Sequence, residues 1–183
     1  MNALQTLLNQ TVNRLFILVW PPYGEDQFLD VDISIGFIFA ERPDRLCVVS
    51  TDMSDMWTPL IRYEAIPNKI HAWSSFDSRI KHWMNSLGHA DFDDEYYFDT
   101  EYYEVTNVDL FENIVSQVIQ SVEFVAIKNI AEPFGVKVNF ENNFILSTPI
   151  ADGNTIETSR FNTLNNHLVF EYFGTIEYRI PEH

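Results

Sequence analysis

Hydrophobic residues recur at helical spacing near the start of the chain and predict an amphipathic helix over residues 2–18, which Pro21 and Pro22 end. A second helix is predicted over 76–87, with Gly88 at its end. Asn107 is placed to cap a third helix that runs to about residue 126, with acidic residues in its first turn.

Alternation of polar and apolar residues over 29–39 predicts a long strand that is buried on one face. A turn at 41–44 leads into a second strand over 45–51, so the two form a hairpin. Shorter β-like runs occupy 60–64, 136–140, 144–148, 168–173 and 175–180. This order predicts the α+β class, with about three helices packed on a mainly antiparallel sheet in one domain over residues 1–183.

The net charge of the chain limits the kinds of partner that it can bind. The chain has 27 acids and 11 Lys and Arg, a net charge of −16. Such a surface repels nucleic acid and anionic membrane and attracts cationic proteins. The longest apolar run, residues 15–20, is far shorter than the about 20 residues that cross a bilayer. The single Cys47 and an N-terminus without a basic leader pattern make the cytosol the expected location.

Common catalytic motifs are absent from the sequence, including nucleotide-binding glycine loops, the nucleophile elbow and zinc-protease signatures. Cys47 lies in an apolar run, where a thiol is usually inert. Asp30 and Asp32 alternate with core positions, so we expect them on the exposed face of their strand. No cofactor is expected.

A metal site is one alternative. His82 and His89 lie seven residues apart, and four acids within 91–95 follow directly. Imidazole and carboxylate groups together can hold a divalent metal that activates water for hydrolysis. The spacing matches no specific ligand set, and Tyr96 stands where a calcium-binding loop needs Gly.

An acidic and aromatic stretch stands out over residues 91–104, with seven acids, six aromatics and no base. As a strand, it has an aromatic-rich face of even positions and an acidic face of odd positions. Carboxylates and Tyr in such a row suit a partner rich in Lys and Arg, although an acidic edge strand that resists aggregation has the same pattern. The candidate partner-binding residues are Asp91, Asp93, Glu95, Tyr97, Asp99, Glu101 and Tyr103, with Asp30 and Asp32 as a second patch.

Small acidic proteins without catalytic motifs often neutralise basic proteins, as immunity proteins, antitoxins and nucleic-acid mimics do. By this analogy of class we expect an inhibitory protein that binds a basic partner, such as a nucleic-acid-cleaving toxin, through its carboxylates and tyrosines. The alternatives are the metal-dependent hydrolase and a small-ligand binding domain whose aromatic residues line a pocket.

Overall fold

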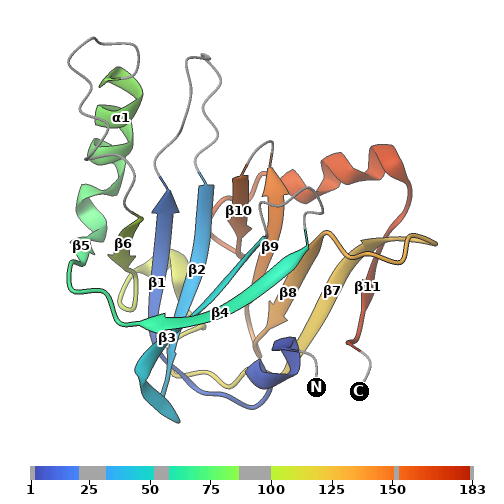
Figure 1. Ribbon diagram of the computed structural model, residues 1–183, viewed down its shortest axis with the longest axis horizontal. Helices are drawn as coiled ribbons and strands as arrows, with labels where there is room; N and C mark the ends of the chain where they lie inside the picture. Colours follow the sequence, from blue (N-terminus) through green and yellow to red (C-terminus); the bar gives the residue numbers. More distant parts are fainter. Residues whose placement is uncertain (1–2, 21–31, 52–57, 87–99, 151–152, 182–183) are drawn as a thin grey trace.

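A computed structural model describes residues 3–20, 32–51, 58–86, 100–150 and 153–181, and these are built mainly of β-strands (Figure 1). Eleven strands in this part form a six-stranded sheet, in the order β4-β3-β2-β1-β6-β5, and a five-stranded sheet, in the order β10-β9-β8-β7-β11. Neighbouring strands are antiparallel, except that β5 and β6 are parallel.

The strands of the six-stranded sheet are β1 (Val12–Trp20), β2 (Asp32–Phe39), β3 (Arg42–Thr51), β4 (Pro59–Ala65), β5 (His71–Ala72) and β6 (Glu101–Glu104). Those of the five-stranded sheet are β7 (Ser121–Ile127), β8 (Gly135–Asn139), β9 (Phe144–Ile150), β10 (Gly153–Glu157) and β11 (Ile176–Arg179). Within the described residues the helical elements are the α-helix α1 (Phe76–Ser86) and the 3-10 segments η1 (Ala3–Leu7), η2 (Trp73–Ser75), η4 (Asp109–Phe111) and η5 (Asn166–Phe173). The α+β prediction is therefore wrong, because only the 76–87 helix of the three is an α-helix.

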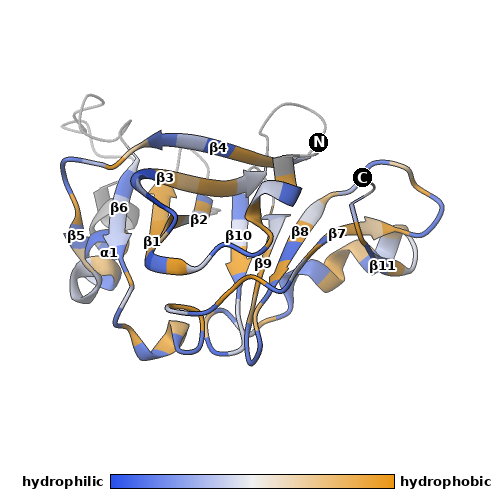
Figure 2. Ribbon diagram, turned by 90° about the horizontal axis from the view of Figure 1, so that it is seen from below, coloured by the Kyte–Doolittle hydropathy of each residue, from blue (hydrophilic) through white to orange (hydrophobic). Residues whose placement is uncertain are grey.

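The first predicted helix is replaced by η1 and the strand β1. Residues 15–19 are all buried, because β1 pairs with β2 on one edge and β6 on the other and is covered on both faces. A strand buried on both faces reads as a continuous apolar run and loses its alternation. This run is the orange strand β1 in Figure 2.

The third predicted helix is replaced by η4, turns and β7. Asn113 and Ser116 have φ values of 63° and 64° in the left-handed region, which a continuous right-handed helix does not allow. Several of the apolar residues at helical spacing are still buried and reach the core from η4, a turn or β7: Phe111, Ile114, Ile119 and Val122. Val118, which the helix pattern also includes, is 45% exposed.

Several strand predictions are confirmed. The hairpin of 29–39 with 45–51 corresponds to β2 and β3, whose register pairs Ile35 with Val49, and residues 29–31 lie outside the described part. The predicted one-sided burial is wrong, because residues 34–39 of β2 and 46–51 of β3 are all buried. The runs at 60–64, 136–140, 144–148 and 175–180 correspond to β4, β8, β9 and β11. The run at 168–173 is wrong, because it lies in the 3-10 segment η5.

Both sheets contribute side chains to one buried hydrophobic cluster, with β10 against β2 and β9 against β3. Its members from the six-stranded sheet include Leu15, Ile17, Val19, Ile35, Phe37, Cys47 and Val49. Its members from the five-stranded sheet include Val122, Val136, Val138, Ile145 and Ile156. The odd-numbered residues of β1 and β2 thus face the second sheet, and their even-numbered residues face away from it.

Candidate binding site

The face of the six-stranded sheet that points away from the second sheet is strongly concave. Tyr102 on β6 donates a hydrogen bond from its hydroxyl to Oε1 of Glu64 on β4, at 2.9 Å. Three strands separate β4 from β6 in the sheet order, so a flat sheet would hold the two strands about 19 Å apart. The sheet therefore curls until side chains of β4 and β6 meet across this face, and Figure 1 shows β4 crossing steeply in front of its neighbours.

Apolar side chains fill the inside of the curl, and a glycine makes room for them. The buried members are Phe16, Leu18, Ile38, Leu46 and Val48. Gly36 lies among them on β2, and a Cβ at this position would stand 2.8 Å from Cδ1 of Leu18 and 3.0 Å from Cδ1 of Leu46.

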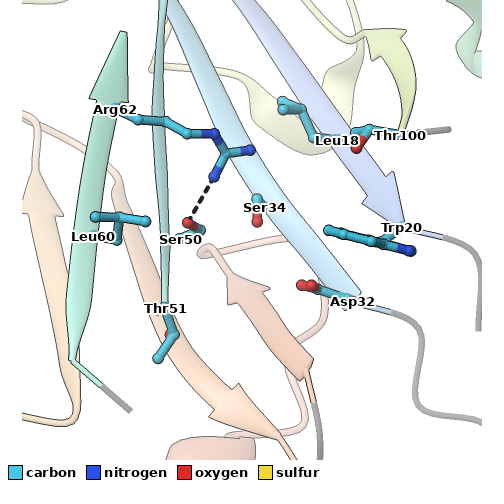
Figure 3. A pocket seen from close by; sticks show the side chains of 9 residues that line it. All are labelled: Leu18, Trp20, Asp32, Ser34, Ser50, Thr51, Leu60, Arg62 and Thr100. Atoms are coloured by element: carbon cyan, nitrogen blue, oxygen red, sulfur yellow. Dashed lines mark hydrogen bonds between the residues drawn. The ribbon is translucent and has the colours of Figure 1, made fainter. Parts of the chain in front are cut away.

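At one end of the concave face the apolar packing gives way to a pocket of about 330 Å³, which is within the size range of small-molecule sites (Figure 3). Its lining comes from β1, β2, β3, β4 and the residue before β6: Leu18, Trp20, Asp32, Ser34, Ser50, Thr51, Leu60, Arg62 and Thr100. The wall of the pocket thus contains one positive side chain, Arg62, one negative side chain, Asp32, and several hydroxyl groups.

Arg62 is held in place within the pocket. Its Nη1 donates to Oγ of Ser50 at 3.1 Å, and its Nε donates to Oε2 of Glu64 at 3.2 Å. The same Glu64 accepts the hydrogen bond from Tyr102, so the contact that closes the curl also positions the guanidinium.

Asp32 is held from the second sheet. Its Oδ1 accepts a hydrogen bond from the backbone N–H of Asn154 at 3.1 Å, and the Asn154 side chain donates to the carbonyl of Ile33 at 2.7 Å. Burial raises the pKa of Asp32, and the hydrogen bond from Asn154 and the charge of Arg62 oppose this rise only in part. The carboxylate therefore gains from any further positive charge that approaches it.

Trp20 lies directly across from Asp32 in the pairing of β1 with β2, and the two side chains lie together at one side of the pocket (Figure 3). Trp20 is 42% exposed although it is a large apolar residue. An indole beside a carboxylate is suited to an ammonium or guanidinium group, because the ring face and the negative charge both attract a cation. Trp20 and Asp32 thus form a candidate cation anchor.

The charge of the chain is unevenly distributed around this pocket. All 11 Lys and Arg lie within the described residues, together with fifteen acids, so this part carries a net charge of only −4. Three segments outside it, 21–31, 52–57 and 87–99, contain ten acids and no Lys or Arg. They join the described chain at strand ends that line the pocket, next to Trp20, Asp32, Thr51 and Thr100. The segments that carry most of the net negative charge are therefore connected to the sheet at the end where the pocket lies.

Of the predicted partner-binding residues, the structure places Asp32 in the pocket and Glu101 and Tyr103 elsewhere. Six fall outside the described residues: Asp30, Asp91, Asp93, Glu95, Tyr97 and Asp99. Their role stays a prediction.

Glu101 and Tyr103 point inward. Tyr103 is fully buried in the main core cluster, and its hydroxyl donates to Oε2 of Glu101 at 2.5 Å. Glu101 also accepts hydrogen bonds from Nε and Nη2 of Arg79 on α1. The prediction that odd positions form the outward face is thus wrong for this pair, because β6 turns its odd residues to α1 and the core.

The metal alternative cannot be placed in the structure, because the side chain of His82 and the residues from His89 to Glu95 lie outside the described part. Within the described residues, no group of three or more His, Cys, Asp or Glu side chains is arranged to hold a metal ion. Cys47 is a buried free thiol whose pKa burial raises to about 12, as expected of an inert core residue.

Sequence reasoning missed Trp20 and Arg62. Trp20 ends the apolar run that extends beyond the predicted helix of residues 2–18, and Arg62 lies in the predicted short strand of residues 60–64. No local signal connects the three, because Trp20 and Asp32 meet through the pairing of β1 with β2, and Arg62 reaches the same pocket from β4.

No family model, curated protein or solved structure matches the chain. Among the described residues, no helix has the length and apolar character needed to cross a membrane.

Proposed function

We propose that this protein binds a basic protein partner at the pocket end of the six-stranded sheet and neutralises it, as an immunity protein or antitoxin neutralises its toxin. The single observation that carries the proposal is the segregation of charge: ten acids and no Lys or Arg lie in the three segments that join the sheet around the pocket. The free buried thiol of Cys47 supports a cytosolic location.

The pocket supplies what a diffuse acidic surface lacks, which is a fixed point of contact. A Lys or Arg side chain of the partner would place its cation against Asp32 and the ring of Trp20. Acids in the three segments would attract the partner over a longer range, which speeds association and makes it sensitive to salt. If the basic site of the partner binds nucleic acid, carboxylates of this protein would occupy the positions of the phosphates and block that site.

The first experiment captures partners from lysate of the native organism on the immobilised protein, with washes at low and then high salt. The captured protein is then titrated against two variants that remove equal charge. The first is Asp91→Asn, Asp93→Asn and Glu95→Gln, and the control is Glu132→Gln, Glu141→Gln and Glu171→Gln on the exposed surface around the five-stranded sheet.

We expect a basic protein that elutes with salt, a large loss of affinity for the first variant and a small one for the control. Equal losses for both variants would mean that only total charge matters. A captured protein that is not basic, or that high salt does not release, would contradict the proposal.

A second candidate function is the binding of a small polar ligand, which is favoured by the pocket volume and by the presence of both Asp32 and Arg62 in its wall. A ligand with an amine and a carboxylate would match both charges. A thermal-shift screen of small zwitterions tests this, because a ligand that binds only the folded state raises the melting temperature. The shift should vanish in Arg62→Gln if the pocket is the site.

A further inference from the structure

The five-stranded sheet ends in a strand whose outer edge has no partner strand among the described residues. β11 pairs with β7 on one side only, and it is the rightmost strand in Figure 1. Unpaired strand edges expose backbone N–H and C=O groups and are templates for a further strand.

The hydrogen bonds of β7 show which backbone groups of β11 point outward. Lys128 donates its N–H to the carbonyl of Thr175, so Thr175 turns its backbone groups toward β7. These groups alternate along a strand, so Glu177 and Arg179 also face β7 while Ile176, Tyr178 and Ile180 face away. The pairing of β7 with β11 agrees with this alternation. Val125 lies opposite Tyr178, and its carbonyl accepts a hydrogen bond from the N–H of Phe134 on the other side of β7, so Val125 and Tyr178 exchange no backbone hydrogen bond.

Residues 176–180 read Ile-Glu-Tyr-Arg-Ile. When this segment is set antiparallel to a copy of itself, Ile lies opposite Ile, Tyr opposite Tyr and the acid opposite the base. We propose that two copies of this chain associate through β11, as antiparallel strands related by a twofold axis at Tyr178, and join their five-stranded sheets into one.

In this register Tyr178 faces Tyr178 of the second copy, and Ile176 faces Ile180. These are the residues whose backbone groups point outward, so each pair can exchange two hydrogen bonds. A register centred on Glu177 or Arg179 would set two like charges directly opposite each other at the axis, which is destabilising.

The side chains fit the same register. Glu177 of each copy lies opposite Arg179 of the other copy. The twofold axis therefore gives two oppositely charged pairs. The two side chains are only half-buried in the single chain, at 35% and 31% exposure, where they form an ion pair with each other. They sit in the pairs that exchange no backbone hydrogen bond, where side chains of antiparallel strands come closest.

Exposed apolar residues flank the edge. Phe173, just before β11, is 66% exposed and Ile180, just after it, is 78% exposed. The antiparallel arrangement brings Ile180 of one copy beside the start of β11 of the other, near Phe173. Association would therefore cover apolar surface at both ends of the paired strands.

The pocket stays open in this dimer, because it belongs to the six-stranded sheet and β11 is the outermost strand of the other sheet. The dimer would thus carry two copies of the pocket. The inference does not depend on the proposed function.

The test is the mass in solution as a function of concentration, measured by sedimentation equilibrium against the chain mass of 21.4 kDa. The wild type should reach twice this mass. Glu177→Arg sets like charges against Arg179 in both pairs and should weaken dimerisation about tenfold or more. Glu141→Arg, at an exposed position outside β11, makes the same charge change and should dimerise as the wild type does.

Tyr178→Pro is an independent test. It removes an outward N–H without removing a hydrogen bond to β7, and edge positions of this kind tolerate proline. The melting temperature of each variant is measured to show that it folds. A folded Tyr178→Pro variant should be monomeric. A monomeric wild type, or a dimer that survives both substitutions in β11, would overturn the proposal.

Discussion

Asp32 at the start of β2 accepts a hydrogen bond from the backbone N–H of Asn154 in β10, at 3.1 Å, and this contact joins the two sheets beside the pocket. It holds the carboxylate in one position without neutralising its charge. A carboxylate that is partly buried, fixed in position and not neutralised is suited to binding a cation rather than to stability.

We expect Asp32→Asn to raise the melting temperature at neutral pH while it weakens binding of a basic partner. Burial raises the folded-state pKa of Asp32, so ionised Asp32 lowers the free energy of unfolding, and this cost is absent at pH values below the ordinary pKa of 3.8. The asparagine keeps the acceptor for Asn154. The stability gain, measured by thermal unfolding from acidic to neutral pH, should therefore disappear in acid. A gain that is the same at every pH would rule out this explanation.

Glu101→Gln should have the opposite profile, with lower stability and little change in binding. Burial disfavours the charge of Glu101, but hydrogen bonds from Arg79 and Tyr103 outweigh it and lower the pKa. Its contribution is present above the unfolded pKa and is lost as the pH falls through the folded pKa. We expect a loss of about 1.5–3 kcal/mol at neutral pH by urea unfolding. Glu132→Gln, at an exposed position, is the control. A reduced affinity of a folded Glu101→Gln variant for the basic partner would show that Glu101 belongs to the binding surface after all.

Tyr102→Phe tests the contact that closes the curl. Losing the hydrogen bond to Glu64 should cost about 1 kcal/mol and lower the melting temperature by about 2–4 °C. Because this contact also positions Arg62, a ligand of the pocket should bind less well. Tyr172→Phe removes the same hydroxyl from a side chain that is 89% exposed and should change neither property. Equal effects of the two substitutions would mean that the hydroxyl does not hold the curl.

Gly36→Ala should destabilise the protein by about 1–3 kcal/mol, because the added Cβ would meet Leu18 at 2.8 Å inside the curl. Leu18→Val removes the atom that clashes. It should destabilise the wild type but restore part of the stability of the Gly36→Ala variant, which a double-mutant cycle measures as a coupling energy. Additive effects of the two substitutions would show that the crowding relaxes elsewhere.

The sequence alone determined the β2–β3 hairpin and α1. Two runs of strand-forming residues on either side of a turn identify the hairpin, although both faces of its strands are buried. Helical periodicity identifies α1. Overall charge is a sum over residues and needs no fold, so the expectation of a cationic partner rests on the sequence alone. Asp32 was found because it belongs to the alternating pattern of β2, although its burial was not foreseen.

Only the tertiary structure decided that residues 12–20 form a strand, since a central strand covered on both faces has no periodicity to distinguish it from a helix. It also decided that Tyr103 is core and Glu101 is paired, because that depends on Arg79 and α1 packing against β6. The pocket joins Trp20 and Asp32 through the pairing of β1 with β2, and Arg62 of β4 through the curl of the sheet. Local sequence reports how each residue is buried along its own element, whereas a site made by curvature depends on contacts between strands far apart in the chain.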